Sequence, residues 1–220
     1  MLVIGIDDAG RGPLIGPMVL AGVLLDDNAE EVLKKNNVRD SKQVVHSSRI
    51  HMAKIIKETA LAYKIVKTSA QDIDKALATG TNLNRLEAMK AAEIINGLNN
   101  GRDKIKVVVD CPSTNKLSWK NMMIEYVENT ENLTILCEHK ADVNHIIVAA
   151  ASILAKVTRE EEVTKLKEQY GPIGSGYPSD PNTKKFLKEK GKELQDSGIF
   201  RKSWSTWKKM FPDEGQNTLF

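Results

Sequence analysis

The sequence has few cysteines. Cys111 and Cys137 are the two cysteines among 220 residues. This number is too small for a disulfide framework, and their spacing matches no zinc-binding pattern. We therefore expect two reduced, partly buried thiols.

The sequence also lacks long hydrophobic runs. No apolar stretch approaches the roughly 18–20 residues that a membrane-spanning helix needs. The first residues, Met1–Gly5, lack the basic region and long apolar core of a signal peptide and predict a first strand instead. These absences predict a cytoplasmic protein with no membrane partner.

The net charge is small, at +3, and by itself does not indicate a nucleic-acid partner. Its distribution is uneven, because residues 184–209 contain nine Lys or Arg and three acids, a net charge of +6. A basic segment favours binding to polyanions. The same pattern is equally compatible with an ordinary solvated helix face.

Apolar runs and helical patterns interleave along the chain, and 41% of the residues are hydrophobic. This pattern predicts an α/β layered domain with a packed core. The first three strands are expected to be antiparallel and the later ones parallel. A long helix is expected from about Asp142 to Tyr170. The five expected strands are Leu2–Ile6, Met18–Leu25, Ala62–Thr68, Lys106–Val109 and Leu133–Cys137.

Four aspartates occupy similar places relative to these strands. Asp7 and Asp8 follow the first strand, Asp110 follows the fourth, and Asp142 comes after the fifth, at a helix start. Ligands of open α/β sheets bind at the carboxyl ends of strands. Clustered carboxylates repel one another unless a cation is present, and hard oxygen ligands suit Mg²⁺ or Mn²⁺. Each acid alone also fits a simpler role, such as a turn former or a helix cap.

Gly10-Arg11-Gly12 follows the first acids directly. Glycines let the backbone approach a ligand closely, and turn amides can bind phosphate or sugar oxygens. A plain tight turn between two strands is the alternative interpretation.

Several blocks, in this order, resemble the type 2 ribonucleases H, and most closely their archaeal branch. Together they extend from about residue 3 to residue 207. The blocks are Gly5-Ile6-Asp7-Asp8-Ala9-Gly10-Arg11-Gly12-Pro13, Asp40-Ser41-Lys42, Asn82-Leu83-Asn84-Arg85-Leu86-Glu87, Val109-Asp110, His139-Lys140-Ala141-Asp142, Ala149 to Lys156, Gly174-Ser175-Gly176-Tyr177-Pro178-Ser179-Asp180-Pro181 and Arg201-Lys202-Ser203-Trp204.

The resemblance implies a ribonuclease H-like five-stranded mixed sheet flanked by helices, with a helical C-terminal extension. It implies endonucleolytic cleavage of the RNA strand of RNA–DNA hybrids, including ribonucleotides embedded in duplex DNA. The products would carry 5′-phosphate and 3′-hydroxyl ends. The implied organisation is a catalytic domain over residues 1–170, a substrate-gripping region over 171–211 and a tail over 212–220.

The resemblance also implies roles for individual residues. Asp7, Asp8, Asp110 and Asp142 would hold two Mg²⁺ or Mn²⁺ ions. Gly10, Arg11 and Gly12 would recognise the ribose 2′-hydroxyl. Tyr177 would stack on the sugar after the ribonucleotide, and Ser41 and Lys42 would contact a backbone phosphate. The basic C-terminal helices, with Trp204 and Trp207, would grip the duplex.

These implied contacts have simpler alternatives. Tyr177 could anchor its own loop against the core, and Lys42 could be a solvated surface lysine. Trp204 and Trp207 could dock a helix, and we expect a core role for at least one of them.

The chain departs from the family pattern at two places. The family usually has Glu at position 8, where this chain has Asp8, whose side chain is one methylene shorter. His145-Ile146 replaces a usual Tyr-Pro pair, and we interpret this change as packing, with His145 on a helix surface.

The C-terminal segment Gln216–Phe220 resembles peptides that bind sliding clamps, although the usual aromatic pair is missing. A frayed polar tail is the simpler expectation. We expect a monomer. The competing hypotheses for the whole chain are a junction resolvase, a phosphotransferase of the actin and sugar-kinase type, and a non-catalytic duplex-binding module.

Overall fold

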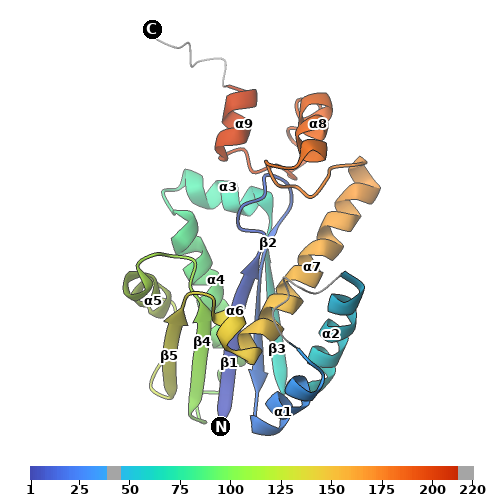
Figure 1. Ribbon diagram of the computed structural model, residues 1–220. Helices are drawn as coiled ribbons and strands as arrows, with labels where there is room; N and C mark the ends of the chain where they lie inside the picture. The colour runs from blue at the N-terminus through green and yellow to red at the C-terminus, as the bar shows by residue number, and fades with distance from the viewer. Residues whose placement is uncertain (39–45, 213–220) are drawn as a thin grey trace. The chain divides into compact units, whose positions relative to one another are not determined.

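The computed structural model describes residues 1–38 and 46–212 (Figure 1). The expected contacts of Ser41 and Lys42 and the tail Gln216–Phe220 therefore lie outside the described residues. The elements, in chain order, are β1 (Leu2–Ala9), β2 (Met18–Leu25), α1 (Asp27–Lys35), α2 (His46–Thr59), β3 (Ala62–Thr68), α3 (Ala70–Ala78), α4 (Leu83–Leu98), β4 (Ile105–Asp110), α5 (Lys116–Ile124), β5 (Leu133–Glu138), α6 (Ala141–Asn144), α7 (Ile146–Tyr170), α8 (Pro181–Lys190) and α9 (Ser205–Met210).

The chain divides into two compact units, neither of which is one continuous stretch. The sheet unit consists of Met1–Ala9, Val19–Lys67 and Asn82–Arg159. The loop-helix unit consists of Gly10–Met18, Thr68–Thr81 and Glu160–Phe220. The four aspartates belong to the sheet unit, whereas Gly10-Arg11-Gly12 and Tyr177 belong to the loop-helix unit.

The sheet has five strands in the order β3-β2-β1-β4-β5. β1 pairs with β2 antiparallel and with β4 parallel, and β4 pairs with β5 parallel. The expected mixed five-stranded sheet flanked by helices is confirmed. Its order places β1 and β4 side by side, although about 95 residues separate them in the chain.

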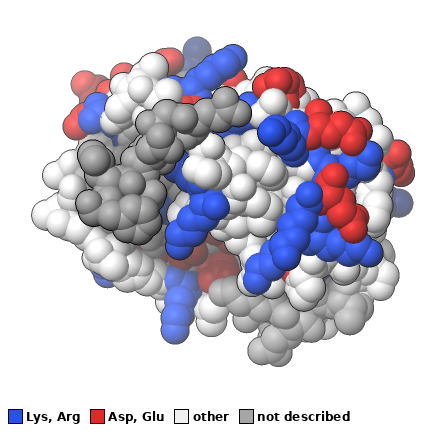
Figure 2. All heavy atoms as spheres, turned by 90° about the horizontal axis from the view of Figure 1, so that it is seen from above, with Lys and Arg blue, Asp and Glu red and all other residues white. Residues whose placement is uncertain are grey.

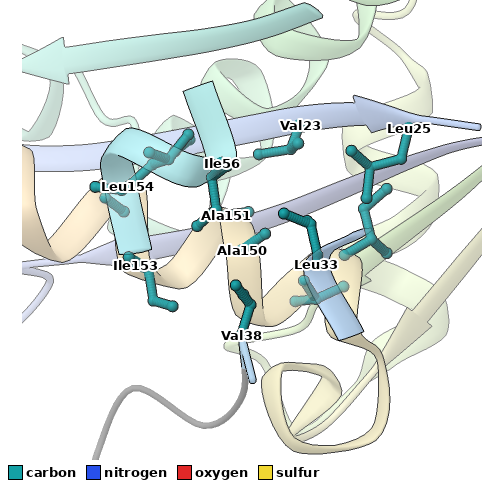
Figure 3. Packing of buried hydrophobic residues seen from close by; sticks show 14 of the residues in the cluster. Val23, Leu25, Leu33, Val38, Ile56, Ala150, Ala151, Ile153 and Leu154 are labelled. Atoms are coloured by element: carbon teal, nitrogen blue, oxygen red, sulfur yellow. The ribbon is translucent and has the colours of Figure 1, made fainter. Parts of the chain in front are cut away.

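One face of the sheet is covered by α1, α2 and the first half of α7 (Figure 3). Val23 and Leu25 of β2 point to this face because alternate residues of a strand point to the same side. They pack in one cluster with Leu33, Ile56 and Ala150. On the opposite face, an added Cβ at Gly22 would collide with Ile94 of α4, so this glycine permits close contact between β2 and α4.

β4 and β5 extend one residue beyond their expected ends, and two larger boundary errors concern the segments of Asp7 and Asp142. β1 does not end at Ile6, because Asp7 and Asp8 continue its pairing with β2, opposite Ala21 and Leu20. The long helix expected from Asp142 is interrupted at His145, whose backbone is extended (φ −128°, ψ 117°). A separate four-residue helix, α6, therefore carries Asp142 and precedes α7.

The loop-helix unit has its own apolar core. Ile15 forms a β-bridge with Phe200, and the Phe200 and Trp207 rings pack with their centroids 4.8 Å apart. Trp207 is buried, which confirms the expected core role for one of the two tryptophans. Among the residues that the structure describes, no helix is long and apolar enough to span a membrane.

Candidate active site

Asp7 and Asp110 lie at neighbouring positions of two parallel strands. Ile6 pairs with Val109, so each aspartate is the next residue on its own strand. Asp110 in turn pairs with Glu138, the last residue of β5. Three acidic residues thus follow one another across β1, β4 and β5 at the carboxyl end of the parallel strands, where ligands of such sheets bind.

Asp7 is only 6% exposed. Burial raises its pKa well above the usual range, and the negative charges of Asp8 and Asp110 raise it further. A hydrogen bond with Ser152 and the backbone N–H of Asp8, which donates to Asp7 Oδ1 at 2.7 Å, act in the opposite direction. In this environment, ionised Asp7 is costly unless a positive charge is nearby.

Close packing of α7 on β1 explains how Ser152 reaches Asp7. Gly5 and Asp7 point to the same face of β1 because side chains alternate along a strand. A Cβ at Gly5 would lie 2.6 Å from the Ile147 backbone, so only glycine allows α7 this close. Ser152, one and a half turns further along α7, is completely buried.

Asp110 is linked directly to the segment that carries Asp142. Its Oδ1 accepts a hydrogen bond from the Ala141 backbone N–H at 2.8 Å, at the start of α6. The preceding residue, Lys140, has a left-handed backbone with φ 57°. Asp142 follows Ala141 and is 4% exposed. The structure therefore joins Asp110 and Asp142 through one hydrogen bond and one peptide unit.

The chemistry of these residues suits a divalent cation, because carboxylates are hard oxygen donors. Among the described residues, no group of three or more His, Cys, Asp or Glu already forms a set that could hold a metal ion. Strand alternation directs Asp8 to the opposite side of β1 from Asp7. The negative charges of Asp8 and Asp110 nevertheless lie near enough to Asp7 to raise its pKa. Such a group of hard oxygen donors, one of them buried, is suited to Mg²⁺ or Mn²⁺.

In the loop-helix unit, a buried arginine holds the glycine turn. The Arg201 guanidinium donates to the carbonyl oxygens of Gly10 at 2.6 Å, Arg11 at 2.8 Å and Gly16 at 3.0 and 3.1 Å. Arg201 is completely buried and packs against the Trp204 ring, 4.9 Å from its centroid. The Trp204 indole N–H donates to the Gly12 carbonyl at 3.1 Å. All three carbonyls of Gly10-Arg11-Gly12 are therefore occupied by two C-terminal side chains.

This arrangement fixes the direction of the turn amides. In a planar trans peptide, the C=O of one residue points opposite to the N–H of the next. The N–H groups of Arg11 and Gly12 must therefore point away from the Arg201 guanidinium. This role of Arg201 was not predicted from the sequence. The available signal was its place in the Arg201-Lys202-Ser203-Trp204 block, since an arginine in an apolar segment needs several carbonyl partners.

Tyr177 lies beside the same turn. Its ring is 3.7 Å from the place where a Cβ would stand on Gly12, and the residue is 40% exposed. The Gly176 carbonyl accepts from the backbone N–H groups of Leu14 and Ile15, which ties the tyrosine loop to the segment after the turn. The loop-helix unit thus brings Gly12 and the partly exposed Tyr177 together.

The mixed sheet and its acidic strand ends define a ribonuclease H-like enzyme. The family model described as Ribonuclease HII matches residues 4–207. Ribonuclease HII of Methanococcus maripaludis is 40% identical over 220 residues, which cover 100% of this chain and 90% of the relative. The chain belongs to the ribonuclease HII family and is an endonuclease of the ribonuclease H type.

Solved structures agree with this assignment. The ribonuclease H2 from Pyrococcus horikoshii OT3 superposes with a TM-score of 0.86 at 36% identity, covering 96% of this chain and 97% of the other. The PCNA:RNase HII complex from Archaeoglobus fulgidus contains a chain with a TM-score of 0.82 at 36% identity, covering 93% of this chain and 96% of the other.

Proposed function

We propose that this enzyme hydrolyses the RNA strand of RNA–DNA hybrids, including ribonucleotides embedded in duplex DNA, and leaves 5′-phosphate and 3′-hydroxyl ends. Asp7, Asp8, Asp110 and Asp142 hold two Mg²⁺ or Mn²⁺ ions. The observation that carries this proposal is the buried Asp7, placed beside Asp110 on parallel strands, with a pKa raised by burial and by its acidic neighbours.

When bound, the ions would lower the pKa of a water molecule and stabilise the departing 3′-oxygen. The chain's own residues orient the ligands. Ser152 forms a hydrogen bond with Asp7, and the Ala141 amide donates to Oδ1 of Asp110. Water is the nucleophile, so no nucleophilic side chain is required.

Substrate recognition is assigned to the loop-helix unit. The outward amides of Arg11 and Gly12 bind the ribose 2′-hydroxyl, which distinguishes RNA from DNA. Tyr177, beside Gly12, stacks on the sugar that follows. Ser41 and Lys42, which are not part of this unit and lie outside the described residues, contact a backbone phosphate.

Exposed lysines of α8 and α9 contact the duplex backbone. The face shown in Figure 2 carries several Lys and Arg side chains, with Asp and Glu side chains between them. Some lysines of this unit are partly neutralised by ion pairs. Lys190 pairs with Glu193 at 2.7 Å, Lys202 with Asp196 at 3.1 Å and Lys185 with Glu189 at 4.0 Å. Binding to the duplex should therefore weaken with salt, because each phosphate contact releases counterions.

The decisive test is cleavage of a DNA duplex that contains one ribonucleotide, with and without Mg²⁺ or Mn²⁺. We expect metal-dependent cleavage of the bond between the phosphorus and the 3′-oxygen. The downstream product then carries the 5′-phosphate, and the upstream product carries the 3′-hydroxyl. Asp7→Asn should abolish cleavage and retain duplex binding. Asp27→Asn is the matched control, because its side chain is 78% exposed on α1. Normal cleavage by Asp7→Asn, or cleavage of a four-way DNA junction but not of the hybrid, would refute the proposal.

A sliding clamp is the proposed protein partner. The Archaeoglobus fulgidus structure contains a related RNase HII bound to PCNA. In this chain, Gln216 and Leu219 have the Gln-x-x-Leu spacing of a clamp-binding peptide, although the aromatic pair that usually follows is missing. Titration of the full chain and of a Leu219→Ala, Phe220→Ala variant with an archaeal clamp tests the assignment. Equal binding by the two chains, or no binding at high micromolar concentration, would remove it.

A further inference from the structure

A side-chain pair closes the short segment that carries Asp142. His145 Nε2 lies 2.6 Å from Glu138 Oε2. Glu138 ends β5, and His145 is the residue that separates α6 from α7. The pair therefore joins the two ends of an eight-residue segment, 138–145, with α6 between them. About a quarter of the His145 side chain and a third of the Glu138 side chain are exposed.

The segment needs such a tie. A helix of four residues cannot stabilise itself, because the cost of forming the first turn is not recovered over so short a length. α6 also follows Lys140, whose left-handed backbone is unfavourable for a residue with a side chain. Asp110 holds the beginning of α6 through the Ala141 amide. At the other end, the backbone N–H of His145 donates to the Ala141 carbonyl at 2.8 Å, and its imidazole reaches back to β5.

Both anchors of α6 come from neighbouring strands in register. Asp110 and Glu138 are paired residues of β4 and β5, and the Cys111 N–H donates to the Glu138 carbonyl at 2.7 Å. The first strand end holds the start of α6, and the second holds its end through His145. α6 is thus fixed at two points on one rigid sheet edge.

We infer that Glu138 and His145 are positioning residues that hold Asp142 in place for divalent-cation binding. This inference rests on the proposed function, in which Asp142 is a metal ligand. Residues that orient metal ligands without contacting the metal typically change metal affinity by about 10–100-fold when they are replaced. The family usually has tyrosine at position 145. In this chain, the Glu138–His145 pair therefore supports Asp142 with a residue that differs from the usual one.

The test is Mn²⁺ binding, measured by calorimetry without substrate and at one fixed pH. His145→Phe keeps a ring and removes the N–H, and we expect Mn²⁺ affinity to fall by about tenfold. A purely electrostatic role predicts the opposite, because losing a group that can carry positive charge near the acids should leave affinity unchanged or increase it. His145→Gln restores a donor that can reach Glu138 and should recover most of the affinity.

Glu138 is tested in the same way. Glu138→Gln removes the charge and keeps an oxygen acceptor, so affinity should stay within about threefold of the parent, whereas Glu138→Ala should match His145→Phe. Equal losses in Glu138→Gln and Glu138→Ala would show that Glu138 acts through its charge, and would overturn the inference. His51→Ala, an exposed histidine of α2, is the control. Melting temperatures in EDTA identify any variant that loses affinity by unfolding, and the glutamine variants then decide.

The two proposals fail in different ways. If the parent chain and Asp142→Asn bind Mn²⁺ equally, Asp142 is not a ligand and the metal site of the proposed function is wrong. If Asp142→Asn loses affinity but His145→Phe binds like the parent, the metal site stands and only the positioning role is refuted.

Discussion

Asp110 accepts a hydrogen bond from the Ala141 backbone N–H at 2.8 Å, and this contact connects the end of β4 to the helix that carries Asp142. Asp110 therefore has a structural role in addition to its proposed role as a metal ligand. The two roles can be separated because an asparagine oxygen can accept the same hydrogen bond.

Asp110→Asn should lose cleavage and keep its melting temperature in EDTA. The hydrogen bond from the Ala141 N–H, which caps the start of α6, remains because the asparagine oxygen can accept it. Asp110→Ala should lose cleavage and also about 1 kcal/mol of stability, the usual value of such a cap, which corresponds to a melting temperature roughly 2–4 °C lower. Calorimetry and a hybrid-cleavage assay on both variants measure the difference. Equal melting temperatures for the two variants would show that the cap contributes little.

Asp7→Asn should stabilise the chain in the absence of metal. Because the pKa of Asp7 is raised in the folded protein, its contribution to stability is fully present below its unfolded pKa of about 3.9 and is lost as pH rises through the folded value. We expect the melting temperature of the parent in EDTA to fall relative to Asp7→Asn between pH 4 and pH 8. Added Mg²⁺ should reverse the order. Parallel curves for the two proteins would contradict this account.

Asp8→Glu tests the departure from the usual family residue. The longer side chain should reach a metal more easily, and we expect turnover to rise by about tenfold, equivalent to ~1.4 kcal/mol. Single-turnover cleavage in Mg²⁺ and in Mn²⁺ measures the change. If the glutamate variant is no faster in either metal, the shorter side chain does not limit this enzyme.

Arg201→Lys should disorganise the glycine turn, because one ammonium cannot replace a planar guanidinium that binds the carbonyls of Gly10, Arg11 and Gly16. We expect a loss of about 2–4 kcal/mol in urea unfolding, since buried carbonyls lose their donors. The KM for a duplex with one ribonucleotide should rise as the turn amides lose their direction. Lys192→Met, at an exposed position, is the control. An Arg201→Lys variant with unchanged stability and unchanged KM would show that the turn keeps its shape without the guanidinium hydrogen bonds.

The sequence predicted the strands well because their signal is local. Met18–Leu25 and Ala62–Thr68 have the predicted bounds, since an apolar, β-branched run flanked by polar residues needs little tertiary information. The boundary errors at Asp7 and at His145 arose where other elements intervene. Pairing with Ala21 extends β1 through Asp7, and His145, whose backbone is extended, pairs with the Glu138 side chain.

The roles of Arg201 and of Glu138 were not visible in the sequence. Arg201 counted as one of many basic residues, although it is completely buried and its partners are carbonyl oxygens about 190 residues earlier in the chain. His145 was expected to lie on a helix surface without a specific contact, and it pairs with Glu138 instead. Contacts between residues far apart in the sequence, or at a break in a helix, leave no periodic pattern in the sequence.

The amino-acid sequence by itself determined the strands, the acids that follow them and the glycine turn next to Asp8, because hydrophobic alternation and turn chemistry are local properties. Only the tertiary structure decided that β4 adds to β1 on the side opposite β2, which brings Asp110 beside Asp7. It alone also decided the burial that raises the pKa of Asp7, because the desolvation of a carboxylate depends on what packs over it.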